Sequence, residues 1–288
     1  MNQPLEVRLY DKNISHTMDM FGYLTFTGSK KPTSITYVVG RESDSDISIF
    51  TDDFLDRSII EKSISKHNIA FLVESRVLYP APYKKIRKVA NLVDLIITHD
   101  MEIVNEFENA VFVPYGGSWV AEEDLTQEWA KSDLISCIAS DNVRTEGHRL
   151  RHWLIDFFSQ EYSWDLWGRG YKKFETKIDP LAKYMYTIAI QNGRYDTYFT
   201  EILTDPFLLR TIPIFWGAPD IGKIFNLEGF YTFNTASELK SILDRIDEKD
   251  YLSKREVIEE NYQIALKMRN SDELLAKALT KYLANCSF

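Results

Sequence analysis

Short runs of β-branched and aromatic residues recur along this chain, with polar, helix-competent stretches between several of them. The runs lie at 7–10, 35–39, 47–50, 69–73, 93–98, 111–114, 134–139, 164–167, 186–190 and 212–216. Strands that alternate with helices form βαβ units on a parallel sheet. The alternation restarts after the glycine-containing segment 115–118, which is typical of a loop or domain break. The sequence therefore predicts two α/β units.

The length agrees with this division, because 288 residues fit about two domains of roughly 150 residues. We expect two Rossmann-like domains that face each other across a cleft, with ligands at the carboxyl ends of the strands. The expected domains are residues 1–123 and 124–270, followed by a C-terminal helix over 271–288.

Several helices are marked by apolar periodicity. After His148, apolar residues spaced as on one helix face predict a buried stripe formed by Leu150, Trp153, Leu154, Phe157 and Phe158. Further helices are expected over 254–268 and 272–283. Pro206 leaves two alternatives open: one kinked helix, or a new helix that Asp205 caps with Pro206 at its first position.

Composition excludes several classes of protein. The net charge of −9 disfavours nucleic acid as the main partner. The two cysteines, Cys137 and Cys286, form neither a disulfide framework nor a metal-binding spacing. No run approaches the ~18 apolar residues of a membrane span, and no signal-peptide pattern is present. We expect a cytoplasmic protein without a transmembrane segment.

Polar residues cluster after the apolar run 186–190. Asn192 follows the predicted strand, and Thr200 is a good N-cap for a helix that begins near Glu201. A helix N-terminus can bind phosphate, while Asn192, Tyr198 and Glu201 can hydrogen-bond a ribose or a base. The alternative is an ordinary strand–loop–helix connection, which the pattern alone favours.

A second candidate follows the predicted strand 134–139. Arg149 and Arg151 lie early in a helix, where cations oppose the helix dipole, so they suit an anionic ligand. The equally weighted alternative is that Arg151 pairs with a carboxylate on a solvated face. The glycine-rich turn 167–170 lacks the third glycine of a dinucleotide fingerprint and is a weak signal.

Glu74 is the candidate general base. It follows the buried run 69–73, and a carboxylate at the carboxyl end of a buried strand is partly desolvated, which raises its pKa. The alternative, an ion pair between Glu74 and Arg76, is favoured without other information.

Three further patterns have simpler explanations. Asp44 and Asp46 have the spacing of a metal site but fit an acidic loop better. His148 and His152 lack the glutamate of a zinc helix. The basic segment 84–88 could contact polyanions, although such a segment is usually a solvated helix face. No residue is assigned to a metal.

Taken in order, these elements resemble the α-1,3-fucosyltransferase family, glycosyltransferase family ten. The match is strongest over residues 184–233 and weaker upstream, and it extends to about residue 245. The segments that carry it are Ile188-Ala-Ile-Gln-Asn-Gly193, Tyr198-Phe-Thr-Glu-Ile202, Ile212-Pro-Ile-Phe-Trp-Gly-Ala-Pro219 and, upstream, Trp167-Gly-Arg-Gly-Tyr171 and Phe71-Leu-Val-Glu-Ser75.

The resemblance implies a GT-B fold with an N-terminal acceptor domain and a C-terminal domain that binds a guanosine-diphosphate sugar. It implies inverting transfer of fucose from GDP-fucose to a saccharide hydroxyl, with Glu74 as base and Arg151 on the diphosphate. The other implied donor-binding residues are Lys177, Asn192, Tyr198, Thr200 and Glu201, with possible contacts from Ser140, Gly168, Gly170, Gln191 and Arg194. Mg²⁺ or Mn²⁺ could assist departure of the diphosphate.

Two departures from the family pattern concern charge. Gln191 replaces a glutamate, and Ile202 replaces a lysine that the family carries near the diphosphate. Either Arg194 or Lys223 compensates, the donor is held differently, or transfer is weak or absent. The alternatives are therefore the same fold with a different nucleotide-sugar donor, or a non-catalytic module that binds glycan or nucleotide.

Overall fold

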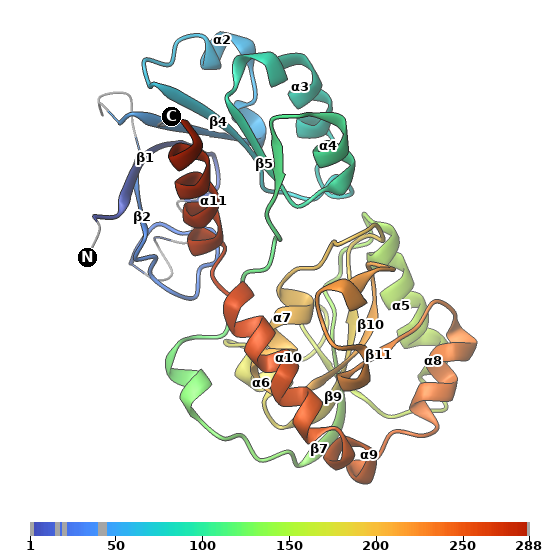
Figure 1. Cartoon of the computed structure of the whole chain (residues 1–288). Helices are drawn as coiled ribbons and strands as arrows, with labels where there is room; N and C mark the ends of the chain where they lie inside the picture. The colour runs from blue at the N-terminus through green and yellow to red at the C-terminus, as the bar shows by residue number, and fades with distance from the viewer. Residues whose placement is uncertain (1–2, 15–17, 19–21, 40–44, 287–288) are drawn as a thin grey trace. The chain divides into compact units, whose positions relative to one another are not determined.

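The computed structural model describes residues 3–14, 18, 22–39 and 45–286. The chain forms two compact units: unit 1 comprises Met1–Tyr115 and Asn270–Phe288, and unit 2 comprises Gly116–Arg269. Each unit has its own sheet, and every strand pair in both sheets is parallel (Figure 1). The predicted α/β class with two parallel sheets is confirmed.

Unit 1 contains a six-stranded sheet in the order β2-β1-β3-β4-β5-β6. Its strands are β1 (Leu5–Tyr10), β2 (Ile35–Val39), β3 (Ile47–Thr51), β4 (His67–Leu72), β5 (Leu95–Thr98) and β6 (Ala110–Phe112). Its helices are α2 (Arg57–Ile60), α3 (Ala81–Val89), α4 (Met101–Glu106) and α11 (Ser271–Cys286), with 3₁₀ turns η1 (Asp52–Phe54) and η2 (Ala90–Leu92).

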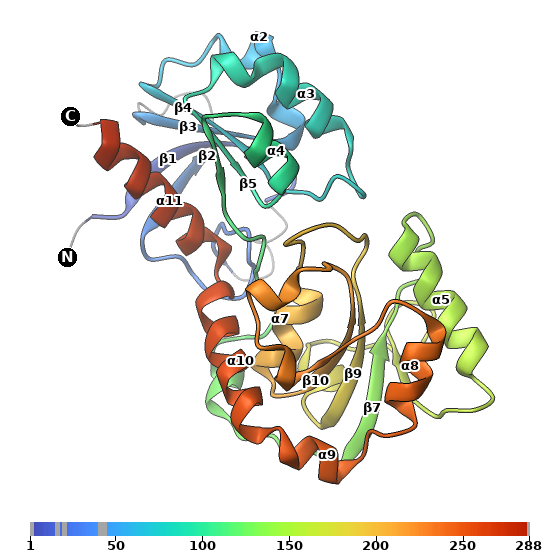
Figure 2. The ribbon, with the colours of Figure 1, turned by 45° about the vertical axis from the view of Figure 1, so that its right-hand side comes forward.

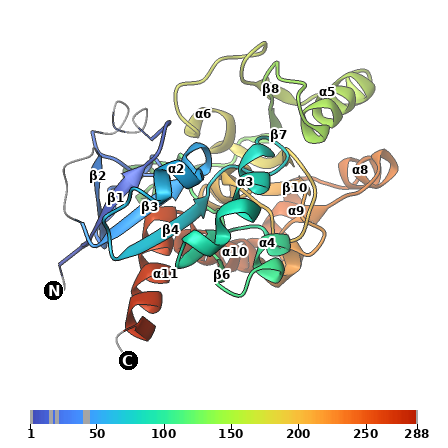
Figure 3. The ribbon, with the colours of Figure 1, turned by 90° about the horizontal axis from the view of Figure 1, so that it is seen from above.

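Helices cover both faces of this sheet, which explains why its inner strands β3 and β5 are buried along their whole length. Successive residues of a strand point to opposite faces, so Ile49 and Ile69 pack with α11, whereas Phe50 and Ala70 pack with α3 and α4. Figure 2 shows α11 on one side of the strands and α3 and α4 on the other. Figure 3 shows β2, β1, β3 and β4 side by side.

Unit 2 contains a five-stranded sheet in the order β11-β10-β9-β7-β8. Its strands are β7 (Asp133–Ile138), β8 (Asp165–Trp167), β9 (Tyr184–Ile190), β10 (Ile212–Trp216) and β11 (Tyr231–Thr232). Its helices are α5 (Glu146–Phe158), α6 (Ile178–Leu181), α7 (Glu201–Leu208), α8 (Ala236–Leu243), α9 (Glu248–Ser253) and α10 (Arg255–Met268), with 3₁₀ turns η3 (Glu123–Thr126), η4 (Ile221–Lys223) and η5 (Leu227–Gly229).

The strand order of unit 2 reverses between β7 and β9. From β7 the chain passes to β8 on one side, and it then returns to β9 on the other side. Such a switch point leaves a crevice at the carboxyl ends of the two strands, where α/β proteins bind ligands. All seven residues of β9 are buried, so this part of the sheet is a rigid support.

Helix α5 is rotated away from the predicted buried stripe. Trp153 and Phe157 are 48% and 58% exposed, and their rings stack on each other with centroids 4.9 Å apart. The reason is Gly147, where a Cβ would lie 1.7 Å from the carbonyl oxygen of Gln191. This close approach turns Arg151 inward, while Leu154 and Phe158 of the predicted stripe are buried as expected.

The units divide the chain at positions that differ from the expected boundaries at 123 and 270. The N–H of Gly117 donates to the carbonyl of Met268 at 2.9 Å, and Val120 lies in the core of unit 2, so this unit begins at Gly116. The segment 271–288 belongs to unit 1, because Leu275 and Leu279 of α11 are buried against its sheet.

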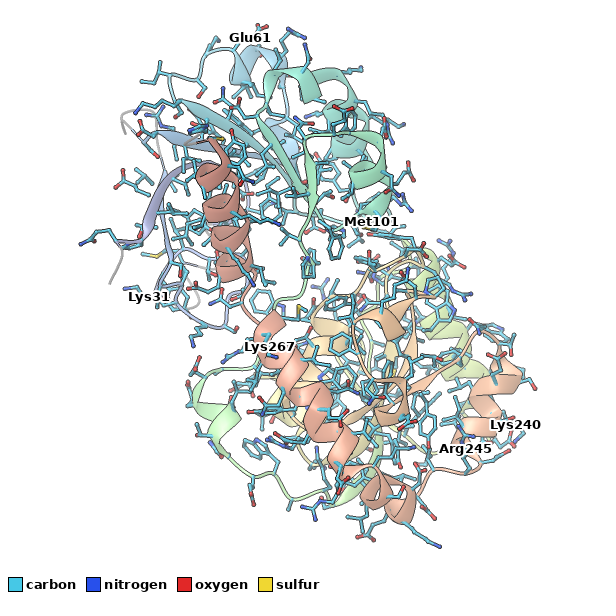
Figure 4. All side chains as sticks on the ribbon, viewed as in Figure 1. Lys31, Glu61, Met101, Lys240, Arg245 and Lys267 are labelled. Carbon is cyan, nitrogen blue, oxygen red and sulfur yellow. The ribbon has the colours of Figure 1, made fainter. Side chains whose placement is uncertain are left out.

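One helix, α7, runs through Pro206, so the alternative of a second helix capped by Asp205 is wrong. Charged side chains such as Glu61 in unit 1 and Arg245 in unit 2 lie on the surface of their units (Figure 4). None of the helices in the described part of the chain combines the length and apolar composition that a membrane crossing requires.

Candidate functional site: a cationic pocket in unit 2

A pocket of about 290 Å³ lies at the switch point of the unit 2 sheet. Its wall is formed by the ends of β7 and β9, the turn after β8, helices α5 and α6, and the start of α7. Six of the residues expected at a donor site line it: Ser140, Arg151, Gly168, Lys177, Asn192 and Glu201. Ser140, Gly168 and Asn192 follow strands, whereas Arg151 and Glu201 lie on helices and Lys177 directly precedes one.

Arg151 is buried in the pocket wall with a side chain that is 7% exposed. One guanidinium N–H donates to the carbonyl of Ile190, whereas Nε has no hydrogen-bond partner among the described residues. Burial lowers the pKa of Arg151, but a guanidinium stays protonated in proteins. The alternative placing Arg151 on a solvated face is wrong. A buried cation with an unused donor matches an anionic ligand.

Lys177 and Asp205 form an ion pair in the same wall, with 3.2 Å between Nζ and Oδ2. Asp205 is fully buried, and its Oδ1 accepts hydrogen bonds from the Ser118 hydroxyl at 2.7 Å and the Trp119 N–H at 3.0 Å. Burial raises the pKa of Asp205, and Lys177 opposes that rise. The sequence pattern indicates only a possible helix cap at Asp205 and gives no signal of its place in the pocket.

Three of the expected donor-site residues lie behind the pocket wall. Thr200 caps α7 by accepting from the Ile202 N–H at 3.3 Å, and its hydroxyl donates to Oε1 of Gln191 at 3.1 Å. Gln191 is fully buried. Tyr198 is 1% exposed and stacks on Tyr195 with ring centroids 4.4 Å apart. These side chains support the pocket and do not line it.

The turn after β8 brings a third cation to the pocket. Gly168 has φ +112°, and a Cβ there would lie 2.0 Å from the carbonyl oxygen of Ala139, so only glycine lets the turn approach β7. Arg169 lines the pocket, is 80% exposed and forms a 3.7 Å ion pair with Asp141. Gly170 lies outside the wall.

The two cations proposed to replace the family's lysine are placed elsewhere. Arg194 donates to Oδ1 of Asn234, and Lys223 pairs with Asp220 at 3.2 Å. Neither residue lines the pocket, whereas Ile202 does. Compensation through Arg194 or Lys223 is therefore not supported by the pocket's composition.

Glu74 belongs to unit 1, where it follows β4 and is half-buried. Its N–H donates to Asp52 at 3.0 Å, and its carbonyl accepts from the Tyr83 hydroxyl at 2.9 Å. Nearby, Arg76 pairs with Asp100 at 3.2 Å and with Glu102. This part of unit 1 gathers carboxylates at the carboxyl ends of β3, β4 and β5.

The weaker candidates have structural roles. His148 forms a capping box with Thr145, and Arg87 of the basic segment pairs with glutamates of α4. Asp46 pairs with Lys66 at 2.9 Å, while Asp44 lies outside the described residues. Over the described ranges, no group of three or more histidine, cysteine or acidic side chains could hold a metal ion.

A larger cavity of about 680 Å³ lies at the opposite, amino end of the unit 2 sheet. Its half-buried Lys131 donates from Nζ at 2.8 Å to the carbonyls of Ala182 and Leu209 and to the Thr211 hydroxyl, which uses all three of its N–H groups. Burial lowers the pKa of Lys131 to about 7. The Lys131 ammonium therefore has no donor left for a ligand, and the smaller pocket is the better candidate site.

Comparison with solved structures identifies the fold. A crystal structure of an α1,3-fucosyltransferase matches 98% of this chain and 90% of that chain, with a TM-score of 0.57 and 16% identity. The chain has a GT-B fold and resembles the α-1,3-fucosyltransferases. A structure of an α1,3-fucosyltransferase with GDP-fucose is similar to this chain to the same extent, with a TM-score of 0.56 and 18% identity. The match covers 98% of this chain and 91% of that chain.

The GT-B fold also occurs with other donors. An α-glucosyltransferase in complex with UDP-glucose and DNA matches 96% of this chain and 90% of that chain, at a TM-score of 0.56 and 11% identity. Among curated proteins, Alpha-(1,3)-fucosyltransferase FucT of Helicobacter pylori is 31% identical over 72 residues, which cover 25% of this chain and 15% of that protein. No protein-family model matches the chain. The predicted resemblance to fucosyltransferases is confirmed.

Proposed function

We propose that the protein is an inverting glycosyltransferase that transfers fucose from GDP-fucose to a hydroxyl of a saccharide acceptor. The observation that carries the proposal is the unit 2 pocket, where the buried guanidinium of Arg151 has an unused donor at the switch point of a GT-B sheet. The similar structures solved with GDP and with GDP-fucose support the choice of donor.

In this proposal the diphosphate is held by Arg151, Lys177 and Arg169. Lys177 is balanced by Asp205 and Arg169 by Asp141, so Arg151 is the one of these three cations without an ion pair among the described residues. Arg169 supplies the positive charge beside the diphosphate that a lysine at the position of Ile202 provides in the fucosyltransferase family. Asn192 and Glu201 also line the pocket, and they provide hydrogen-bonding groups for the ribose and sugar hydroxyls.

The reaction is a single displacement. Glu74 accepts the proton of the acceptor hydroxyl, whose oxygen forms a bond to the anomeric carbon while the bond from that carbon to the diphosphate oxygen breaks. The electron pair of the broken bond leaves with GDP, and the cations of the pocket stabilise the charge that develops there. The configuration at the anomeric carbon is inverted.

Calorimetric titration with GDP, GDP-fucose, GDP-mannose, UDP and UDP-glucose, each with and without Mg²⁺ or Mn²⁺, tests this proposal. We expect binding restricted to guanosine nucleotides, and release of GDP when GDP-fucose and a suitable saccharide are both present. A preference for uridine nucleotides would contradict the assigned donor, and binding without turnover over an acceptor panel would contradict catalysis.

Two alternatives keep the fold and change the activity. Transfer from another nucleotide sugar is favoured by the equal structural similarity to the UDP-glucose-bound α-glucosyltransferase and by Ile202 in the pocket wall. A non-catalytic module that binds glycan or nucleotide is favoured by the loss of the family's lysine. The donor panel distinguishes the first alternative, and the GDP-release assay distinguishes the second.

A further inference from the structure

Asp52 holds the segment on which Glu74 lies. It is the first residue after β3, in η1, and it is only 8% exposed. Its Oδ1 accepts the N–H of Val73 at 3.1 Å, and its Oδ2 accepts the N–H of Glu74 at 3.0 Å. Because β4 ends at Leu72, these two N–H groups lie just beyond the sheet ladder, and one carboxylate satisfies both.

The other side of Glu74 is held as well. The hydroxyl of Tyr83, a residue of α3 that is 5% exposed, donates to the Glu74 carbonyl at 2.9 Å. The backbone of Glu74 is therefore fixed at its N–H by η1 and at its C=O by α3. Because its backbone is held on both sides, the Glu74 side chain leaves the sheet in one defined direction.

We infer that Asp52 is a positioning residue for Glu74: its ionised carboxylate fixes the backbone from Val73 to Glu74 and thereby directs the Glu74 carboxylate. This inference rests on the proposed function. An ionised carboxylate accepts both N–H bonds, whereas a protonated carboxyl or an asparagine amide has a hydrogen on one of the two positions and accepts only one well. Protonation of Asp52 therefore removes one of the two hydrogen bonds that direct this segment.

The groups around Asp52 place the pKa of its carboxyl near neutral pH. Burial is the main cause that raises the pKa of Asp52 to about 7, the N–H groups of Glu74 and Val73 oppose it, and the Glu74 and Asp11 carboxylates add to it. Three further titratable groups lie close by: Asp53, which pairs with Lys12 at 3.6 Å, Tyr79, whose neutral hydroxyl donates to Asp53, and Lys85, whose Nζ donates to the Asp53 carbonyl at 3.0 Å. Activity is thus expected to fall as pH decreases through about 7.

Stability is expected to change in the opposite sense. A carboxyl whose pKa is raised in the folded state stabilises the fold most below its unfolded pKa, and that contribution is lost as pH rises through about 7. If acid lowered activity by unfolding the protein, activity and the free energy of unfolding would fall together as the pH decreases. A fall in activity while the fold gains stability therefore reports on the site and not on unfolding.

The kinetic test compares the wild type with Asp52→Asn and with Asp53→Asn, a control that removes a neighbouring carboxylate with no hydrogen bond to the Val73 or Glu74 N–H. We expect Asp52→Asn to lower kcat by about 10- to 100-fold, to leave the donor KM unchanged and to abolish the ionisation near neutral pH. Asp53→Asn keeps the wild-type profile. An Asp52→Asn enzyme with wild-type kcat and pH profile would overturn the inference.

A spectroscopic test does not depend on activity. In ¹⁵N-labelled protein the amide resonances of Val73 and Glu74 should shift with a midpoint near pH 7, and this titration should persist in Glu74→Gln and vanish in Asp52→Asn. Loss of the titration in Glu74→Gln, or its persistence in Asp52→Asn, would refute the role of Asp52. If the titration follows Asp52 but no transfer occurs, the proposed function has failed instead.

Discussion

Arg151 shows how a single residue can be costly to the fold and useful to the site. A buried guanidinium with an unused N–H loses hydration that the protein does not replace, and such a group is destabilising until an anion binds. On the same helix, Arg149 is exposed and donates to the carbonyls of Val143 and Arg144. The two arginines form a natural pair for mutation.

Arg151→Ala should weaken GDP binding by about 10- to 100-fold, because it removes a charge-assisted hydrogen bond worth about 1.5–3 kcal/mol. Calorimetry measures the change, and Arg149→Ala is the matched control with unaltered affinity. An Arg151→Ala dissociation constant equal to that of the wild type would reject its role on the diphosphate.

Glu74→Gln should reduce turnover by about 10²- to 10⁴-fold, since the amide cannot accept the proton of the acceptor. Nucleotide binding should be intact, because the pocket is lined only by residues of unit 2. Glu61→Gln, an exposed residue at the end of α2, serves as control (Figure 4). Unchanged turnover in a GDP-release assay would remove Glu74 from the mechanism.

The sequence predicts site residues whose position follows from a strand end, and it misses those that depend on distant partners. Asn192 and Ser140 lie two residues after the ends of β9 and β7, so their place in the pocket could be anticipated. Asp205 could not be, because the groups that hold it, Ser118 and Trp119, lie 87 and 86 residues earlier in the chain. Its only local signal is the proline that follows it.

At the scale of elements, strands are better predicted than helix faces. Parallel strands covered on both sides leave unmistakable apolar runs. In contrast, the segment 53–67 has a helical composition but contains only η1 and the short α2, because Ser63 and Ser65 hydrogen-bond to Ser48 and turn the chain into β4. The rotation of α5 is set by contact at Gly147, which no periodicity reveals.

Helix α11 stabilises unit 1 through a few apolar contacts. Leu279 is fully buried against the sheet, so Leu279→Ala should cost about 2–5 kcal/mol of unfolding free energy. Leu252→Ala, on α9 and 49% exposed, should change it by less than about 0.5 kcal/mol. Chemical denaturation measures both, and equal effects would contradict the packing of α11.

For the whole molecule, the decisive feature is that unit 2 is continuous in sequence while unit 1 is not. A fragment 116–269 should therefore fold cooperatively and bind GDP with an affinity close to that of the full chain, because it contains every residue of the pocket. Circular dichroism and calorimetry test this. Failure of a folded fragment to bind would mean that unit 1 contributes to the nucleotide site.

The return of α11 to unit 1 also sets the order of events on the ribosome. The six strands of unit 1 are synthesised first, but the sheet face that Leu275, Ala276 and Leu279 cover stays open until all of unit 2 has been made. The usual sequence, in which the N-terminal domain matures first, is thereby reversed. During synthesis the apolar face that α11 covers is therefore exposed, and we expect unit 1 to be the part of the nascent chain that chaperones bind.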